Sequence, residues 1–183
     1  MSAKAAAEQT KLARMESGKS ILVVGTGPVG CLISNAAASM GASKIIVSEP
    51  NEARLSAAEK FGADVLVNPK EEDLIQTVKN ATKGRGCDIV MVAVPSAEAQ
   101  ESALKCAAKR GFVNLFSGLP KGTRPIGVDS NFLHYNEAFV FGSHGSVPRQ
   151  HKIAVDIIAA GKINTKALLT HRFSLARFHE AYA

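Results

Sequence analysis

The fold of this 183-residue chain is decided by Ile21-Leu22-Val23-Val24-Gly25-Thr26-Gly27-Pro28-Val29-Gly30. Four apolar residues run into three glycines with the spacing G-x-G-x-x-G, and an alanine-rich segment, 31–40, follows at once. This order predicts a buried strand, a tight turn and the start of a helix. In such a turn the first glycine permits the bend, the second lets a pyrophosphate approach, and the third allows close packing of the helix. The N-terminus of the helix would offer its amides to the phosphates.

The second predicted strand supports a dinucleotide as the ligand. It spans 44–48 and ends in Glu49, 19 residues after Gly30. An acid at about this spacing accepts hydrogen bonds from the ribose hydroxyls of adenosine. The carboxylate would repel a 2′-phosphate, so Glu49 favours NAD over NADP. Arg54 leaves NADP open, because an arginine nearby can bind that phosphate. The alternative is a purely structural turn followed by a solvated glutamate.

Composition indicates an ordinary globular protein. The chain is 46% hydrophobic and 21% charged, and its net charge of +6 comes from basic residues spread along the sequence. Aromatic residues make up only 5%, and we expect no nucleic-acid partner. No apolar run approaches the ~18 residues of a membrane span, so no membrane is expected. Residues 1–19 lack the apolar core of a secretory signal, which favours the cytoplasm.

Cysteine and histidine spacing predicts no metal site. The three cysteines, Cys31, Cys87 and Cys106, lie far apart in the sequence, and their odd number suggests reduced thiols. Each is surrounded by apolar or small residues, as a core cysteine would be. The chain contains no C-x-x-C and no paired histidines. We therefore predict neither metal ligands nor a catalytic residue in this chain.

Predicted strands and helices alternate from the glycine turn onward. The strands are expected at 21–24, 44–48, 64–67, 88–94, 112–116 and 138–141, and 167–169 is a further short strand. The helices are expected at 31–40, 53–61, 71–81, 97–109, 148–160 and 175–182, the last capped by Ser174, with a short turn near Phe132. The helix at 148–160 would turn Ile153, Val155, Ile157 and Ile158 mostly inward. This alternation predicts an α/β fold: a doubly wound parallel six-stranded sheet of order 3-2-1-4-5-6, with helices on both faces. Residues 1–17 would form an N-terminal helix or extension, and 18–183 the dinucleotide-binding domain.

In this topology the ligand lies at the carboxyl ends of the strands. The loops after strands one and two would hold pyrophosphate and adenosine, and the loops after strands four, five and six would flank the nicotinamide. His144 is the most tempting catalytic residue, but a contact with the cofactor, or none, is the preferred interpretation. The expected cofactor contacts are Gly25, Thr26, Gly27, Pro28, Val29, Gly30, Glu49, Pro50, Arg54, Val94, Pro95, Ser117, Gly118, Leu119, Ser143 and His144.

Several of these motifs together resemble a known family. Gly25–Gly30, Ser48-Glu49-Pro50, Arg54-Leu55 and Phe61-Gly62-Ala63-Asp64 resemble the Rossmann cofactor domain of medium-chain, zinc-dependent dehydrogenases. The segments 114–120, 142–146 and 169–175 look like the polyol branch, the sorbitol or iditol dehydrogenases. The resemblance covers about residues 18–183. It implies NAD as cofactor and hydride transfer from an alcohol carbon, with zinc stabilising the alkoxide.

The resemblance also implies what lies outside this chain. In that family a separate catalytic domain carries the zinc ligands, so zinc is expected only there and the chain alone is expected to be inactive. The family's cofactor domains commonly dimerise through the sixth strand, which implies a homodimer through 138–142. The main alternative is a non-catalytic NAD-binding regulatory or assembly module. A methyltransferase is disfavoured by Gly30, and a short-chain dehydrogenase by the lack of Tyr-x-x-x-Lys, since Tyr135 is followed by Phe139.

Overall fold

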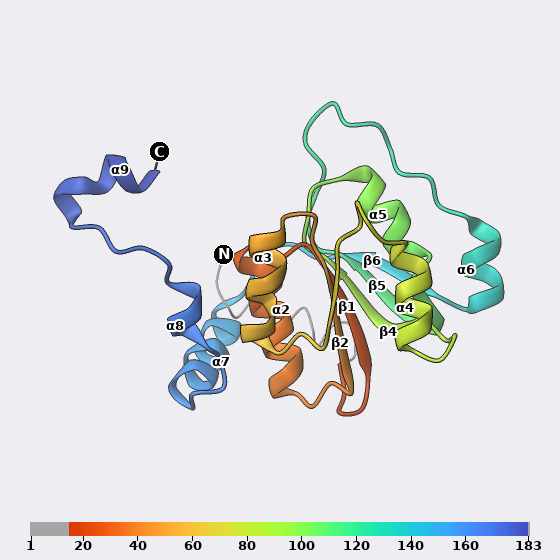
Figure 1. Cartoon of the computed structure of the whole chain (residues 1–183), viewed down its shortest axis with the longest axis horizontal. Helices are drawn as coiled ribbons and strands as arrows, with labels where there is room; N and C mark the ends of the chain where they lie inside the picture. The colour runs from red at the N-terminus through yellow and green to blue at the C-terminus, as the bar shows by residue number, and fades with distance from the viewer. Residues whose placement is uncertain (1–14, 183) are drawn as a thin grey trace.

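One parallel sheet forms the centre of the molecule (Figure 1). The structure, a computed structural model, describes residues 15–182, so the predicted extension 1–17 lies almost wholly outside it. Within the described residues the six strands follow the order β3-β2-β1-β4-β5-β6, and all neighbours pair in parallel. This confirms the predicted fold class and strand order. The strands are β1 (Ser20–Val24), β2 (Lys44–Ser48), β3 (Val65–Val67), β4 (Cys87–Val92), β5 (Ala107–Leu115) and β6 (Phe139–Gly142).

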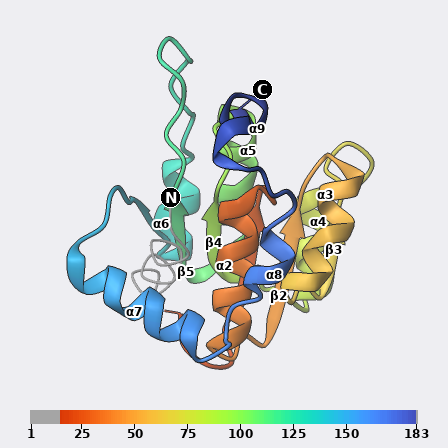
Figure 2. The same cartoon turned by 90° about the vertical axis from the view of Figure 1, so that its left-hand side faces the viewer.

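Helices cover both faces of the sheet, as predicted (Figures 1 and 2). Helices α2 and α3 lie on one face, together with the segment around α7 and α8, and α4, α5 and α6 lie on the other. The helical elements are α2 (Pro28–Ser39), α3 (Glu52–Ala57), η1 (Ala58–Phe61), α4 (Leu74–Ala81), α5 (Ala97–Leu104), α6 (Ser130–Asn136), α7 (Pro148–Ala159), α8 (Thr165–Leu168), η2 (Leu175–Arg177) and α9 (Phe178–Tyr182). No helix between residues 15 and 182 is long and apolar enough to cross a membrane.

The alternation of side chains along the strands divides the core into two layers. Ile21 and Val23 of β1 pack with Ile33 of α2 on one face. Leu22 of the same strand packs with Val78 of α4 on the other face. Successive side chains of a strand point to opposite faces, so a strand covered by helices on both sides must be apolar throughout. The run 21–24 meets this requirement, and β1 therefore occupies the middle of the sheet.

Local capping sets the starts of two helices, α3 and α4, and α4 begins at Leu74 rather than at the predicted residue 71. The Asn51 side chain accepts a hydrogen bond from the Arg54 amide at 3.0 Å and begins α3. The Asp73 side chain accepts from the amides of Ile75 and Gln76 at 2.9 and 3.1 Å and begins α4. Short polar side chains at this position satisfy amides that the first helical turn leaves unpaired. Both helices start at the carboxyl edge of the sheet, which is the edge that matters for the ligand.

The predicted helix 97–109 is too long. Helix α5 ends at Leu104, and β5 begins at Ala107. The Cys87 amide donates to the Cys106 carbonyl at 2.9 Å, and Cys87 pairs with Ala107 across the strands. Alanine and lysine favour a helix locally, but pairing with the buried strand β4 overrides that preference.

Three predictions in the C-terminal part are also wrong. Residues 167–169 do not form a strand: they overlap the short helix α8, which Asn164 caps by accepting from the Ala167 amide at 3.3 Å. The turn near Phe132 is the helix α6. The last helix is split into η2 and α9, and the Ser174 side chain makes no capping hydrogen bond.

Helix α7 is buried less than its sequence suggests. Ile153 and Ile157 are half-buried, but Val155 is 64% exposed and Ile158 is 39% exposed. The predicted inward face is therefore wrong for these two residues. Helix α7 follows an edge strand, so one side of the helix has no neighbouring layer within the described residues.

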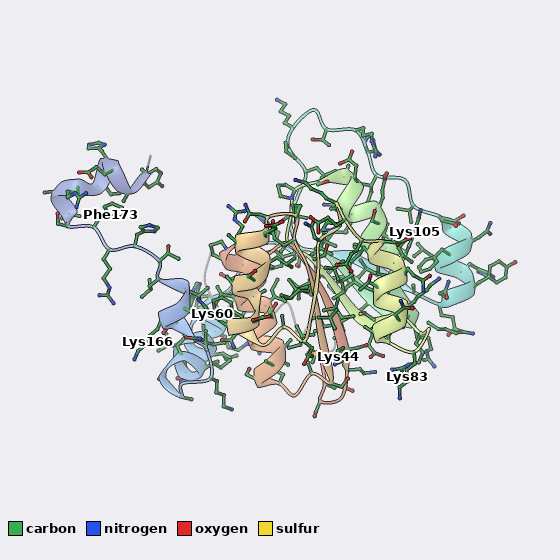
Figure 3. All side chains as sticks on the ribbon, viewed as in Figure 1. Lys44, Lys60, Lys83, Lys105, Lys166 and Phe173 are labelled. Carbon is green, nitrogen blue, oxygen red and sulfur yellow. The ribbon has the colours of Figure 1, made fainter. Side chains whose placement is uncertain are left out.

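The last residues extend away from the sheet. Residues 169–182, here called the C-terminal arm, lead outward from α8 to the far end of the molecule (Figure 1). Phe173 marks this arm in Figure 3, where it lies well apart from the packed layers. Of the lysines labelled in the same figure, Lys44, Lys60 and Lys166 lie on β2, η1 and α8, and Lys83 and Lys105 lie in the segments after α4 and α5. Their spread agrees with the scattered charge of the sequence.

Candidate cofactor site

The glycine turn after β1 packs tightly at its two ends and is open in the middle. Gly25 has a φ of +93°, a left-handed conformation that side chains rarely adopt. A Cβ on Gly30 would lie 1.8 Å from the Gly25 carbonyl oxygen, so a side chain there would collide with the backbone. A Cβ on Gly27 would meet no atom within 4 Å. The turn thus holds the helix close to the strand while it leaves backbone accessible at Gly27.

Helix α2 begins directly at this turn. Gly27 is its N-cap, Pro28 is its first residue, and no side chain caps the first turn. The first turn contains no acidic side chain either. Unpaired amides and the positive end of the helix dipole make such an N-terminus suited to an anion. The turn therefore fits the pyrophosphate of a dinucleotide.

Glu49 links the turn to the next strand. Only 6% of the residue is exposed, and its Oε2 accepts hydrogen bonds from the Thr26 amide at 2.9 Å and the Thr26 hydroxyl at 3.1 Å. Its Oε1 accepts from the Asn51 amide at 3.1 Å. A buried carboxylate requires such donors to offset its lost hydration. Glu49 is thus held in a defined position at the end of β2.

A cavity of about 820 Å³ opens beside Glu49. We call it the switch-point cavity, because it lies where the strand order reverses between β1 and β4, the usual ligand position in such sheets. Five of the predicted contacts line it: Gly25, Glu49, Pro50, Arg54 and Val94. The remaining turn residues, Thr26 to Gly30, follow directly in the chain. The structure therefore brings the two loops predicted for pyrophosphate and adenosine together.

The loops after β5 and β6 lie at the same edge but do not line this cavity. The Ser117 carbonyl accepts from Gln100 Nε2 at 2.9 Å, and Gly118 and Leu119 follow it. The Ser143 hydroxyl donates to Asn114 Oδ1 at 3.0 Å. His144 is exposed. Pro95 is likewise exposed, between two residues that do line the cavity. These residues remain predicted contacts for the nicotinamide end.

Part of the cavity wall was missing from the sequence-based prediction. The loop after β3 and the start of α4 contribute Pro69, Lys70, Glu72, Asp73, Leu74 and Ile75, and α5 contributes Glu98, Ala99 and Ser102. The position of the loop after β3 and of the start of α4 could have been inferred from the topology. The loop after the third strand must reach the same edge as the loops after its parallel neighbours. Those residues were omitted because their sequence carries no recognisable binding motif.

The described residues do not fit a zinc ion. No group of three or more His, Cys, Asp or Glu side chains is close enough to hold a metal between residues 15 and 182. Cys31, Cys87 and Cys106 are all buried free thiols. Burial raises the pKa of Cys31 and Cys87 and raises the pKa of Cys106 to about 12. Thiols of this kind stay protonated at neutral pH, whereas a metal needs the thiolate.

Comparison with known proteins identifies the family. The family model described as zinc-binding dehydrogenase matches residues 28–160. L-threonine 3-dehydrogenase from Pyrococcus furiosus is 32% identical over 96% of this chain and 51% of its own length. Sorbitol dehydrogenase from Bacillus subtilis is 33% identical over 96% of this chain and 48% of its own length. The chain thus spans about half the length of the curated relatives it matches.

Solved structures share the fold. Alcohol dehydrogenase TADH from Thermus sp. ATN1 superposes with a TM-score of 0.89 at 23% identity, over 98% of this chain and 51% of that one. An alcohol dehydrogenase from Escherichia coli CFT073, complexed with NADH, has a TM-score of 0.87 at 23% identity, over 98% and 52%. A zinc-binding dehydrogenase from Sinorhizobium meliloti 1021, bound to NADP, has a TM-score of 0.82 at 25% identity, over 89% and 48%.

These matches support the resemblance drawn from the motifs. They favour a dehydrogenase half over a non-catalytic regulatory module, because the named relatives are dehydrogenases. The matched region begins at Pro28, in the middle of the glycine turn, and continues through β6 to the end of α7. The chain belongs to the zinc-binding dehydrogenase family and is its cofactor-binding domain.

Proposed function

We propose that this domain binds NAD(H) and serves hydride transfer between a secondary alcohol and NAD when it is joined to a zinc-bearing catalytic domain. One observation carries the proposal. The buried Glu49 lies beside the glycine turn from which α2 starts without a side-chain cap, and both are at the edge of one cavity of about 820 Å³. NAD, when bound, supplies the hydride acceptor. The amides at the start of α2 would hold its pyrophosphate, and Glu49 would accept a ribose hydroxyl.

The preference for NAD over NADP is part of this proposal. A carboxylate at Glu49 repels the 2′-phosphate of NADP at short range. Arg54 and Lys70 also line the cavity and could offset that repulsion. The related structures include one with NADH and one with NADP, so the family fold accepts both. Glu49 is buried while Arg54 is exposed, which supports NAD as the favoured cofactor.

Titration of NADH tests the proposal directly. We expect a saturable change of NADH fluorescence on addition of the 183-residue chain. Gly27→Ala adds a methyl group where no protein atom lies within 4 Å, so the fold should persist while NADH binding weakens about tenfold or more. Gly127→Ala is the matched control, since its Cβ would meet only Glu101 Oε1 at an ordinary 3.5 Å. The absence of saturable binding to the wild-type chain would refute the proposal.

The catalytic part of the proposal concerns the whole dehydrogenase. The described residues contain no metal cluster, so we propose that the isolated chain does not turn over alcohol substrates even with added zinc. Assays with sorbitol and L-threonine, substrates named for the relatives, should show no NADH formation. Turnover by the isolated chain would contradict the proposal that catalysis requires the zinc-bearing domain.

A homodimer through residues 138–142 is the proposed assembly. Strand β6 is the edge of the sheet, and Phe139 is 51% exposed while its ring stacks on Phe112 at 4.8 Å. An edge strand can pair with a second copy of itself. Sedimentation velocity over a range of concentrations tests this arrangement. The three cysteines are free thiols, which supports a reducing compartment such as the cytoplasm as the site of action.

A further inference from the structure

Thr26 is a buried polar residue in a turn that is otherwise made of glycine, proline and valine. Only 5% of it is exposed. Both of its donors, the amide and the hydroxyl, bind the same atom, Glu49 Oε2, at 2.9 and 3.1 Å. The two residues are 23 positions apart. Two hydrogen bonds on one oxygen restrict that carboxylate more than one bond would, because they fix both its distance and its plane.

The other oxygen of Glu49 is less fully used. Oε1 accepts one hydrogen bond, from the Asn51 amide at 3.1 Å. A carboxylate has about four sites for hydrogen bonds, two on each oxygen. Thr26 therefore occupies the sites of Oε2, and Oε1 keeps one site for a further donor. Because Glu49 lines the switch-point cavity, that donor can come from a ligand in the cavity.

The backbone around this pair is anchored on both sides. The Gly25 amide donates to the Ser48 carbonyl at 2.8 Å, and the Glu49 amide donates to the Val67 carbonyl at 3.1 Å. The first bond joins the ends of β1 and β2, the second joins the ends of β2 and β3, and neither involves Thr26. The Thr26 hydroxyl is thus not needed to build the sheet. Within the described residues its hydrogen bond goes to the Glu49 side chain.

We propose that Thr26 is a positioning residue that acts through Glu49 to select an adenosine ribose with a free 2′-hydroxyl over a 2′-phosphorylated one. The inference rests on the proposed binding of NAD(H). With Oε2 held by Thr26, the carboxylate presents Oε1 to a hydroxyl and keeps its negative charge at a fixed place. Without the Thr26 hydroxyl, the carboxylate can turn, so it binds the hydroxyl less well and repels a phosphate less strongly.

Thr26→Val tests this role. It removes the hydroxyl donor, keeps the shape of the side chain and leaves the hydrogen bond from the backbone amide of residue 26 to Glu49. We expect the Kd for NADH to rise about fivefold, the effect of one hydrogen bond, while the Kd for NADPH stays the same or falls. Thr26→Ser restores the donor and should return the NADPH-to-NADH Kd ratio to within about twofold of wild type. Equal losses for both cofactors in Thr26→Val would overturn the proposal, since a merely structural role moves both together.

A double variant shows whether Thr26 acts through Glu49. In a Glu49→Ala background, Thr26→Val should leave the Kd ratio unchanged, because the group that it positions is gone. Additive effects would overturn the proposal. Thr82→Val is the matched control for stability: the Thr82 hydroxyl is also buried, donating to the Val78 carbonyl at 2.7 Å and accepting from the Gly86 amide at 2.9 Å. Thr82 does not line the cavity, so its loss should not change the ratio.

The contact itself can be tested without cofactor. The Thr26 amide should be protected from hydrogen exchange in the wild-type chain and exchange at least about tenfold faster in Glu49→Ala. The Gly25 amide, bonded to Ser48, should keep its protection in both. If the wild type binds neither NADH nor NADPH, both the proposed function and the selective role of Thr26 fail. If NADH binds but the Thr26 amide exchanges equally in both proteins, only the positioning role fails.

Discussion

Two helices of this domain start from the same local signal and end in different environments. Helices α2 and α7 are each 12 residues long, and each begins with a proline after a glycine-containing turn, at Pro28 and Pro148. Helix α2 has seven buried residues, whereas α7 has one, Ala154. The strands before them explain the difference: β1 lies in the middle of the sheet and β6 at its edge. The sequences agree with this difference, because α2 contains no charged residue whereas α7 contains Arg149, Lys152 and Asp156.

The turns before these helices differ in the same way. A side chain on Gly30 would strike the Gly25 carbonyl oxygen, whereas a Cβ on Gly145 would meet nothing within 4 Å. Thr26 of the first turn is buried, and His144 of the second loop is exposed. The first turn is therefore part of the core, and the second is a surface loop. Substitutions at matching positions should separate the two regions.

The largest effect is expected from Gly30→Val. The new Cβ would lie 1.8 Å from the Gly25 carbonyl oxygen, which is a backbone atom and cannot turn away as a flexible side chain could. We expect a loss of about 4 kcal/mol or more in the free energy of unfolding, measured by urea denaturation with circular dichroism. Gly145→Val is the counterpart: its φ of +75° is strained for valine, but the space is open, and a loss of only about 1 kcal/mol is expected. Similar midpoints for the two variants would contradict the comparison.

A smaller effect is expected inside the helices themselves. Ile33 of α2 is fully buried between the helix and the sheet, and Ile33→Ala should cost about 3 kcal/mol because it leaves a cavity. Ile158 of α7 is partly exposed, and Ile158→Ala should cost less than about 1 kcal/mol. Thermal unfolding of both variants measures the difference. A cost for Ile158→Ala equal to that of Ile33→Ala would mean that α7 is covered in solution.

The same comparison explains what sequence reasoning could predict. The strand order, the turn geometry and the position of Glu49 follow from local patterns: apolar runs, glycine spacing and the acid after the second strand. The end of α5 does not, because Ala107 joins a strand only through its pairing with Cys87, 20 positions earlier. The bonds between Thr26 and Glu49 are likewise invisible in a linear pattern. Val155 and Ile158 looked inward-facing because periodicity does not reveal whether a helix has a layer to pack against.

The loop after β5 follows a strand between the central β1 and the edge strand β6, and an ion pair holds this loop. Arg124 donates two hydrogen bonds to Glu101 of α5, at 2.6 and 2.9 Å, and the Gly127 amide donates a third at 2.6 Å. The hydrogen bonds from Arg124, followed by that from Gly127, lower the pKa of Glu101 to about 2 from 4.5. The loop after this strand, which is next to the edge, therefore depends on a titratable contact.

This pKa shift gives a pH dependence with a definite sign. A folded-state pKa below the unfolded value means that the stabilisation is complete above about pH 4.5 and is lost as the pH falls toward 2. In Glu101→Gln the free energy of unfolding should therefore fall less steeply as the pH drops from 4.5 to 2. The free energies of the wild type and the variant should become similar near pH 2. Urea midpoints at pH 5, 3.5 and 2.5 measure the slopes. Parallel curves for wild type and variant would show that the contact does not contribute in solution.

The smallest effect is expected in the C-terminal arm. Leu175 is 91% exposed, and the neighbouring contacts in the arm join its own residues: Arg177 with Glu180, and Phe178 with Tyr182. An apolar side chain that is already in water contributes almost nothing to folding, so Leu175→Ser should change the free energy of unfolding by no more than about 0.5 kcal/mol. Urea denaturation at two protein concentrations measures it. A loss above about 2 kcal/mol at both concentrations would mean that the arm packs against its own sheet, and a loss that appears only at the higher concentration would mean that a second copy covers it. Either result would remove the contrast between the two ends of the molecule, because Leu175 would then be buried in solution, as the residues of α2 are.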